Sequence, residues 1–514
     1  MAKFYIIALT FAAHLYSIVT CVSTNGETQF GVMLDAGSSG TKIKVYEWQN
    51  TRTVTDIPSM DLRYGHKFTP GIGRYATHRE GLTKYLSNIV AKAKDVVPEE
   101  KWKSTPMYLM ATAGARILDG DIALGLLNRI RNILSNTTLN PFRFRGRNVR
   151  ILSGEEEGVF AWISLNAVSG FFSSVKPMNE SLGLLEMGGG STQIAFIPST
   201  PLYAGEFQIF LGGRRFDLYA HSYLFFGANY IKERVKNILM ASSPQSQTID
   251  HPCRLIGDDL SGTTDSGQPL KFQGTSDPSK CIQILRQLLS KAPDDRCYPK
   301  PCAIGSVYQP SIGNMPFYAT QGFVYTPNTM GSLDADKHLN ITHLKDESII
   351  YCQKSFEDVK AQYSVKAKFA SDECLMGLYI PLLLQRCGLS FEDVKAQYSV
   401  KAKFASDECL MGLYIPLLLQ ESYQFDPHTS NIVVEDKIQG NKIDWTMGAL
   451  LYELNMMFQS WKLLPHTPVS CQPISFTAVP GSPAEVRPNS ALVPGHALQT
   501  VLLCVLVVLL ETRH

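Results

Sequence analysis

Hydrophobic and polar positions alternate along two stretches of the chain that each predict a β-hairpin. The first, Gln29–Trp48, contains two apolar runs joined by a turn of small residues after Asp35. The second, Ser181–Pro198, repeats that order, with Glu186 before a turn of glycine, serine and threonine. One chain therefore carries two turns of the same composition, each preceded by an acid.

Other stretches have the period of a helix or of a buried strand. Apolar residues at helical spacing predict a helix over Thr77–Val97, and Pro106–Leu118 begins as a buried strand that runs into small residues. A further strand precedes a helix that begins near Ser153, which can cap it, and three glutamates lie in its first turn. Strands that alternate with helices favour an α/β fold.

Length and charge restrict the classes of function. A chain of 514 residues is too long for one core, so two or more domains are expected. The net charge is 48 − 46 = +2 without a basic block, so nucleic acid is not an expected partner.

Both ends of the chain point to the secretory route. Residues 1–23 contain an apolar run behind Lys3 followed by small residues, which is typical of a signal peptide, with an N-terminal anchor as the alternative. Residues 471–490 predict a stalk, and residues 491–514 contain an apolar segment that is either a transmembrane span or a lipid-anchor signal. We therefore expect a membrane-anchored protein at the extracellular side of the plasma membrane.

Cysteines and glycosylation sequons agree with that compartment. None of the eleven cysteines lies between residues 22 and 252, and eight lie between 253 and 409 without metal-type spacing, which favours disulfides. Asn136, Asn179 and Asn340 each begin a glycosylation sequon.

A stretch of 31 residues occurs twice without change, at Ser355–Gln385 and Ser390–Gln420. The period is 390 − 355 = 35 residues, and a cysteine upstream repeats with it, which defines a tandem duplication over residues 352–420. Solenoid repeats diverge in sequence and are more numerous, so the identical copies indicate a recent exon duplication or an error of gene or transcript assembly. An assembly artefact or an aberrant splice form is favoured. A compact lobe has one position for this unit, and we expect the second copy to fill it.

The two acid-bearing turns predict a polyphosphate site. Glycine allows several backbone amides to approach one anion, and an acid beside them suggests a hard divalent cation between carboxylate and phosphate. Gly37 and Thr41 follow Asp35 by two and six residues. Gly188 and Thr192 follow Glu186 at the same offsets, 186 − 35 = 151 residues later. The repetition predicts two similar half-structures whose turns face one polyphosphate, although either turn alone would be an ordinary hairpin.

The sequence lacks the motifs that mark several other kinds of phosphate-binding or hydrolytic site. The chain contains no P-loop, no H-E-x-x-H helix and no G-x-S-x-G elbow. No serine or cysteine forms a recognisable nucleophile–base pair, and the D-K-T-G signature of aspartyl-phosphate pumps is missing. Direct attack by water is therefore the expected mechanism.

Five segments then identify a resemblance: VMLDAGSSGTKIKVYEW, YLMATAGARIL, SGEEEGVFAWISLN, LLEMGGGSTQIAF and IDWTMGALLYELN. In this order they resemble the signature regions of the ecto-nucleoside triphosphate diphosphohydrolases, the apyrase family, in its cell-surface type. The resemblance spans Phe30 to Phe458. It implies an α/β fold of two actin-like, ribonuclease-H-type lobes with an active-site cleft between them. Lobe I would comprise residues 24–165 plus 440–470, and lobe II residues 166–439.

The resemblance also implies the activity and the residues that carry it. Such enzymes hydrolyse terminal phosphates of nucleoside tri- and diphosphates with Ca²⁺ or Mg²⁺. Glu157 would be the general base and Gln193 would orient the water; Asp35 and Glu186 would hold the metal through its waters. The phosphate-binding residues would be Ser38, Ser39, Gly40, Thr41, Thr112, Ala113, Gly188, Gly189, Gly190 and Ser191. Tyr414 and Phe323 would bind the base, or else pack in the core.

Other expectations remain open at this point. The predicted disulfides are Cys253–Cys281, Cys297–Cys302 and Cys387–Cys409. Glu186-Met187 departs from the common Asp-Leu pattern of the family and lengthens the metal-binding side chain by about one C–C bond, roughly 1.5 Å. The main alternative is a surface protein that binds nucleotides but is catalytically impaired by the duplication. A related kinase is less consistent with export, and a homo-oligomer is one option for the assembly.

Overall fold

The structure is a computed structural model that describes residues 26–50, 56–78, 80–173, 176–264, 267–293, 295–363, 405–428 and 431–462. The predicted signal peptide, stalk and C-terminal apolar segment lie outside these ranges. Residues up to Trp461 belong to one compact unit, which is the one described below. Within the described ranges, no helix is both long and apolar enough to cross a membrane.

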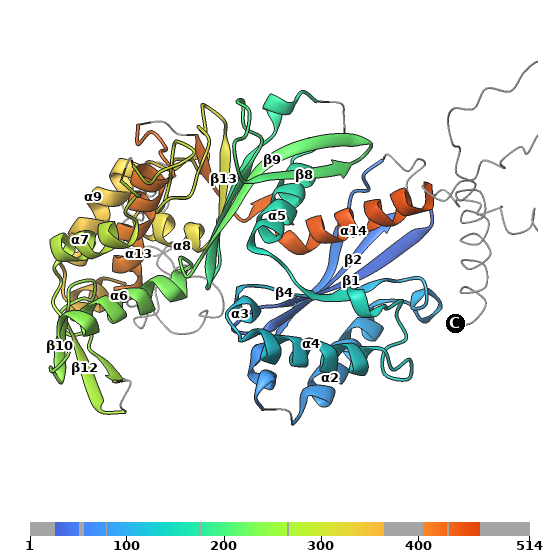
Figure 1. The fold of residues 1–514 in the computed structure, drawn as a ribbon, viewed down its shortest axis with the longest axis horizontal. Helices are drawn as coiled ribbons and strands as arrows, with labels where there is room; N and C mark the ends of the chain where they lie inside the picture. The colour runs from blue at the N-terminus through green and yellow to red at the C-terminus, as the bar shows by residue number, and fades with distance from the viewer. Residues whose placement is uncertain are drawn as a thin grey trace, which may run out of the picture. The chain divides into compact units, whose positions relative to one another are not determined.

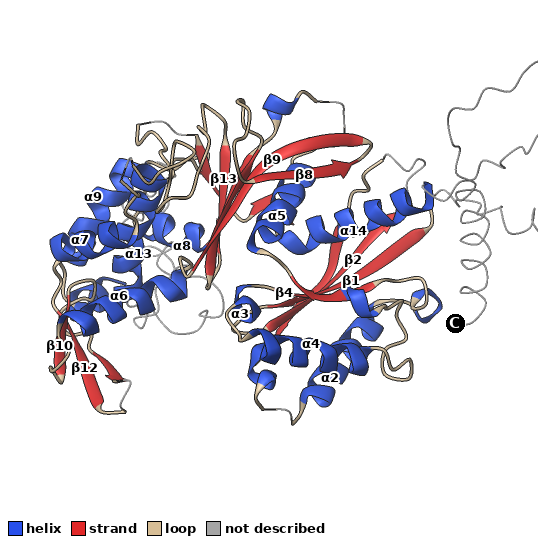
Figure 2. Cartoon of the chain, in the orientation of Figure 1, coloured by secondary structure: helices blue, strands red, loops and turns tan. Residues whose placement is uncertain are grey.

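The first sheet of this unit has five strands in the order β3-β2-β1-β4-β5. Figures 1 and 2 show β1, β2 and β4 of this sheet side by side. β1 and β2 form the first predicted hairpin and pair antiparallel, with Asp35 opposite Lys42, whereas β4 and β5 continue the sheet in parallel. The strands are β1 (Thr28–Ala36), β2 (Thr41–Gln49), β3 (Asp61–Phe68), β4 (Met107–Ala111) and β5 (Val149–Ile151).

The second sheet has six strands in the order β14-β13-β6-β7-β9-β8. β6 and β7 form the second predicted hairpin, with Glu186 opposite Gln193, and β13 and β14 continue in parallel. The strands are β6 (Gly183–Met187), β7 (Ser191–Phe196), β8 (Glu206–Leu211), β9 (Arg214–Leu224), β13 (Phe317–Gln321) and β14 (Ile432–Val434).

The two sheets share one topology. β1, β2, β3, β4 and β5 of the first correspond to β6, β7, β9, β13 and β14 of the second, with the same antiparallel and parallel pairings. The prediction of two similar half-structures is therefore confirmed at the level of the sheets. Each acid-bearing turn joins the two strands of the equivalent hairpin.

Helices cover these sheets. In the N-terminal part they are α2 (Leu82–Val96), α3 (Ala113–Arg116), α4 (Gly120–Leu134) and α5 (Gly154–Val168), and the last described helix is α14 (Trp445–Lys462). α2 begins later than predicted, after Gly81, whose positive φ of 82° ends the preceding turn. α5 has the predicted cap: Ser153 and Glu156 form a reciprocal capping box.

α5 and α14 share a core with both sheets. Met33 and Tyr108 of the first sheet and Leu184 and Ala195 of the second belong to one buried cluster with apolar residues of these two helices. α5 is buried over most of its surface, which explains why its sequence has apolar residues on every face. The predicted lobe boundaries near residues 165 and 440 stay a prediction.

The cysteine-bearing region packs on the second sheet. Its helices are α6 (Ala228–Ser242), α7 (Pro278–Leu288), α8 (Gly322–Thr329), α9 (Ile341–Cys352), α10 (Phe356–Tyr363) and α13 (Ala405–Leu417). A small sheet contains β10 (Thr248–His251), β11 (Leu260–Thr263) and β12 (Pro269–Gly274), and a two-stranded ribbon pairs β15 (Lys437–Ile438) with β16 (Asn441–Lys442). The disulfides Cys253–Cys281 and Cys297–Cys302 are both present.

The third predicted disulfide, Cys387–Cys409, is wrong. Cys409 on α13 bonds to Cys352 at the end of α9, across a sequence separation of 57 residues. The reason is that the two copies share one position in the fold: the first supplies α10, and the second supplies α13 from Ala405 onward. The expectation that the second copy alone fills this position is therefore also wrong, and Cys387 lies outside the described residues.

Candidate active site

The first candidate phosphate turn lies between β1 and β2. The Gly37 amide donates to the Gly40 carbonyl (3.0 Å), which closes the turn and leaves the exposed Ser38 and Ser39 at its tip. The amides of Ser38 and Ser39 have no acceptor among the residues that the structure describes. The turn therefore presents free N–H groups and hydroxyls to solvent, as an anion-binding nest requires.

The second turn, between β6 and β7, has the same internal bond at the same offset. Gly188 donates to the Ser191 carbonyl (2.9 Å), and the start of α6 binds the carbonyls of the turn: Ala228 donates to Gly188 (2.9 Å) and Asn229 to Gly189 (3.0 Å). With its carbonyls occupied, the turn keeps the Gly189 and Gly190 amides without an acceptor within the described chain. The two turns are thus equivalent in geometry as well as in sequence.

The two turns meet a third loop that contains Thr112 and Ala113. A Cβ placed on Gly190 would lie 2.7 Å from the Ala113 Cβ, and one placed on Gly114 would lie 2.7 Å from the Ser38 Cα. A Cβ on Gly189 would lie 3.9 Å from the Ser38 hydroxyl oxygen. Only glycine permits the two approaches of 2.7 Å, so Gly114 and Gly190 allow the three loops to come together.

Glu157 lies in the first turn of α5, beside these loops. Its carboxylate is buried, and Oε2 accepts a hydrogen bond from Arg116 Nη2 at 2.9 Å. The same guanidinium nitrogen donates to the Ser191 hydroxyl at 3.1 Å, which links Glu157 to the second turn. Burial raises the pKa of Glu157 to about 7, with Arg116 opposing the rise and the Asp35 charge adding to it.

Sequence reasoning missed Arg116. It lies on α3, directly after the third loop, and its side chain is largely buried. A signal was available, because Arg116 is the only charged residue in the apolar and small stretch Pro106–Leu118. A lone arginine there needs an anionic partner, and Glu157 is that partner.

Gln193 faces the same region from β7. Its Nε2 donates to Ser191 Oγ at 2.6 Å and to Ser222 Oγ at 3.2 Å, while its buried Oε1 has no partner within the described chain. An amide fixed through its nitrogen presents its oxygen as an acceptor of defined direction. Ser222, which the sequence analysis did not single out, helps to fix that direction.

Asp35 and Glu186 are both buried acids, and the charge of Asp35 acts on Glu186. Asp35 accepts from Lys42 Nζ at 3.3 Å, and Glu186 Oε1 accepts from the Gln321 amide. Burial raises the pKa of both acids, and Glu186 is raised further by Glu157 and Asp35. Lys42 partly compensates Asp35, whereas Glu186 forms no ion pair with a basic side chain in the described part of the chain. A bound cation would supply positive charge at Glu186.

The residues present fit a hydrated divalent cation. Glu186 Oε2 is buried without a hydrogen-bond partner in the described part of the chain, so one carboxylate oxygen is available. No group of three or more acidic, histidine or cysteine side chains with metal-binding geometry occurs among the described residues. Two separate acids are the donor set expected for Mg²⁺ that keeps most of its waters.

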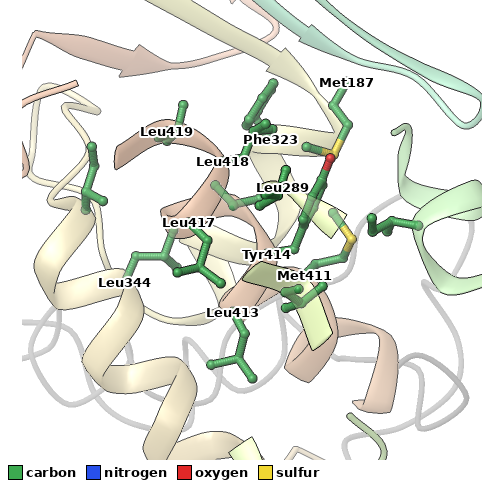
Figure 3. Close-up of a cluster of buried hydrophobic side chains, with 14 of the residues drawn as sticks. Met187, Leu289, Phe323, Leu344, Met411, Leu413, Tyr414, Leu417, Leu418 and Leu419 are labelled. Atoms are coloured by element: carbon green, nitrogen blue, oxygen red, sulfur yellow. The ribbon is translucent and has the colours of Figure 1, made fainter. Parts of the chain in front are cut away.

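The two expected base-binding rings do not line this site. Tyr414 and Phe323 are completely buried in one hydrophobic cluster with leucine and methionine side chains (Figure 3). The Tyr414 hydroxyl is used internally, as it donates to the Phe226 carbonyl at 2.8 Å. Neither ring is open to a base in this structure, which favours the core-packing alternative over the predicted base binding.

Comparison with known proteins identifies the family. The family model described as the GDA1/CD39 (nucleoside phosphatase) family matches residues 21–386 and 382–466, two segments that overlap where the two copies of the duplication meet. The chain belongs to the GDA1/CD39 nucleoside phosphatase family. The resemblance and the enzyme class predicted from the five segments, nucleoside triphosphate diphosphohydrolase or apyrase, are thereby confirmed.

Individual relatives show how similar this chain is to known proteins. Rat ectonucleoside triphosphate diphosphohydrolase 8 is 31% identical over 84% of this chain and 84% of its own. A pea nucleoside-triphosphatase is 31% identical over 70% of this chain and 80% of its own. Among solved structures, nucleoside triphosphate hydrolases from Neospora caninum superpose with a TM-score of 0.57 at 15% identity, covering 89% of this chain and 98% of theirs, which supports the two-lobe fold.

The three sequon asparagines, Asn136, Asn179 and Asn340, are all exposed. Asn340 also caps α9, where its side-chain oxygen accepts from the His343 amide at 2.8 Å. Glycan attachment through the nitrogen leaves that oxygen available, so the cap and the modification are compatible. Whether these positions carry glycans stays a prediction.

Proposed function

We propose that this protein hydrolyses the terminal phosphates of nucleoside tri- and diphosphates, down to the monophosphate, with Ca²⁺ or Mg²⁺. The observation that carries the proposal is the meeting of two equivalent amide-bearing turns beside the buried Glu157 carboxylate. Each turn would hold one of two adjacent phosphates. Membership of a family of nucleoside phosphatases supports this substrate class.

The chemical step is a displacement by water. Glu157, ionised, accepts a proton from the water while the water oxygen bonds to the terminal phosphorus. The bond from that phosphorus to the bridging oxygen breaks, and the shortened nucleotide leaves with the electron pair. Gln193 Oε1 accepts a hydrogen bond from the same water, since it has no other partner within the described chain.

Arg116 and the acids prepare the site for this step. Arg116 fixes the direction of the Glu157 carboxylate and opposes the rise in its pKa, so that the ionised base is present near neutral pH. Asp35 and Glu186 would hold the hydrated cation, which when bound neutralises phosphate charge. Lys42, paired with Asp35, keeps positive charge at that acid.

We further propose that the reaction takes place outside the cell, on a membrane-anchored protein. The three disulfides and the ectonucleoside triphosphate diphosphohydrolase relatives support passage through the secretory pathway. ATP, ADP and AMP supplied to intact cells that express the protein test both parts. Phosphate release from ATP and ADP but not AMP is expected, and absence of release from ATP in lysed as well as intact cells would refute the activity.

The catalytically impaired alternative depends on the duplication. Because the copies are identical, deletion of residues 364–398 restores a single copy of the unit. A chain that hydrolyses ATP only after this deletion would favour the impaired alternative. Equal activity of the full-length and single-copy chains is expected, because the residues of the two phosphate turns and Glu157 lie far from the repeat in sequence.

A further inference from the structure

Glu186, one of the two acids proposed to hold the cation, is contacted by a residue of the neighbouring strand. β13 pairs parallel to β6 with Thr320 opposite Glu186, so the next residue, Gln321, ends its strand beside the acid. The Gln321 side-chain amide donates to Glu186 Oε1. An ionised carboxylate only accepts hydrogen bonds, so the amide nitrogen is the atom that faces it. One oxygen of Glu186 is therefore engaged, while Oε2 is buried without a partner within the described chain.

The first half-structure shows that the topology by itself does not require a glutamine at this place. By the same register, the residue that ends β4 beside Asp35 is Ala111. Asp35 is held instead by Lys42, its partner across the hairpin, whose Nζ lies 3.3 Å from Oδ2. Gln321 thus takes the part that Lys42 has at the first acid, because it supplies the donor that fixes one carboxylate oxygen.

The backbone of Gln321 has a conformation that glycine adopts most easily. Its φ of 58° and ψ of −114° are unfavourable for a residue that carries a Cβ. The Gln321 amide donates to Asp436 Oδ1 at 2.7 Å, and a Cβ placed on Gly322 would lie 2.9 Å from the Met187 carbonyl oxygen. These contacts hold the strained residue in place. Because glycine would fit this backbone without strain, the contact that the side chain makes with Glu186 explains the glutamine, and strain of this kind concentrates at ligand sites.

We propose that Gln321 is a positioning residue that restricts Glu186 to one free oxygen and thereby sets the preference of the site between Mg²⁺ and Ca²⁺. The proposal rests on the proposed function, because it requires the cation that this function assigns to Glu186. Ca²⁺ takes about six to eight oxygen ligands in flexible geometry and often uses both oxygens of a carboxylate, whereas Mg²⁺ takes about six and keeps several waters. A carboxylate that turns both oxygens to an ion gives up a hydrogen bond on one of them. The bond from Gln321 therefore opposes Ca²⁺ more than Mg²⁺.

Substitution of Gln321 tests this role. Gln321→Met removes the amide donor and keeps a side chain of similar length. The affinity for Ca²⁺ should then rise about tenfold relative to the affinity for Mg²⁺, since a hydrogen bond to a charged group corresponds to about that factor in an equilibrium constant. Thermal unfolding at graded concentrations of CaCl₂ or MgCl₂ gives both dissociation constants without nucleotide or turnover. A purely structural role would change both affinities by the same factor, so their ratio is the deciding quantity.

Three further variants make the test specific. Gln321→Gly, which suits the backbone, should shift the ratio in the same direction. Gln208→Met is a matched control, because Gln208 also donates to a glutamate, Glu206 (2.9 Å), but lies at an exposed position of β8. It should leave the ratio unchanged. In a Glu186→Asp background, whose acid is one methylene shorter, adding Gln321→Met should change the ratio by less than about twofold, because the hydrogen bond is already lost.

The outcomes separate this inference from the proposed function. Equal ratios in wild type, Gln321→Met and Gln321→Gly would overturn the positioning role, and cation-dependent ATP hydrolysis by the same wild type would leave the proposed function standing. A ratio that shifts as expected supports the positioning role even if the wild type releases no phosphate from ATP. A wild type whose Tm responds to neither cation would refute the cation site, and this inference with it.

Discussion

Arg116 Nη2 lies 2.9 Å from Glu157 Oε2 and joins the third loop of the site to the first turn of α5. Both side chains are largely buried, so the pair is shielded from solvent and each charge depends on the other. The arginine also donates to Ser191, so a single side chain connects the general base to the second phosphate turn.

This pair predicts a change in the pH dependence of activity. Burial raises the pKa of Glu157 to about 7 against the opposing effect of Arg116, and the base acts only when ionised. Activity should therefore fall as pH drops through about 7. Replacing Arg116 by Met removes the opposing charge and should move this acidic limb of kcat/KM upward by about one pH unit. Arg116→Lys should move it less, and identical limbs in wild type and Arg116→Met would contradict the role of the pair.

Cation binding should affect stability in a pH-dependent way. The folded-state pKa values of Asp35 and Glu186 are raised, so folding favours their protonated forms. Without a cation, their contribution to stability is present at low pH and is lost as pH rises from the unfolded values near 4 through the folded ones. Mg²⁺ or Ca²⁺ should therefore raise Tm more at pH 7.5 than at pH 4.5.

Substitution of the same acids tests that prediction. In EDTA at pH 7.5, Asp35→Asn and Glu186→Gln should each raise Tm, by roughly 2–4 °C for each kcal/mol recovered. Both variants should lose most of the cation-induced rise. Thermal unfolding followed by calorimetry measures these changes, and a cation effect that is the same in the variants and in wild type would exclude the two acids as the binding site.

Lys44 on β2 and Asp444, just before α14, form a second buried ion pair. Although burial by itself raises the pKa of Asp444, Lys44 and Lys42 hold it well below its usual range. Lys44→Met should destabilise the fold by about 3–5 kcal/mol, because it leaves a buried charge without its nearest partner. Lys44→Met combined with Asp444→Asn should recover much of that loss in urea unfolding. A double variant as unstable as the sum of the single ones would show that the pair is not coupled.

The position shared by the two copies predicts a specific disulfide. Non-reducing peptide mapping of the full-length chain should find Cys352 linked to Cys409. In a chain that lacks residues 364–398, the same two cysteines should pair across the single copy. A Cys387–Cys409 peptide as the main product would show that the second copy occupies the position by itself.

The sequence predicted the hairpins and turns well because their information is local. The offsets of Asp35 and Glu186 to their glycines fix the turn geometry, and the alternation of apolar residues fixes the strands around them. The same holds for the start of α5, where Ser153 and Glu156 provide a recognisable cap. These elements depend on contacts within a few residues.

The errors arose where the outcome depends on tertiary packing. Tyr414 and Phe323 have aromatic side chains of the kind that stack on a base, but their role depends on whether they are buried. No local sequence pattern reveals that burial. The role of Arg116 depends on its hydrogen bond to Glu157, which lies 41 positions later in the sequence. Identical copies of the repeat give no local reason to choose Cys352 over Cys387, and packing of α9 against α13 decides it.

Phosphate release from ATP by the wild-type chain and by Glu157→Gln, each with Mg²⁺ and with excess EDTA, tests the central claim most directly. The wild type should release phosphate only with the cation. Glu157→Gln should lose activity by roughly 10²–10⁴-fold while still binding etheno-ADP. Equal turnover by the two proteins, or release that continues in EDTA, would contradict the account.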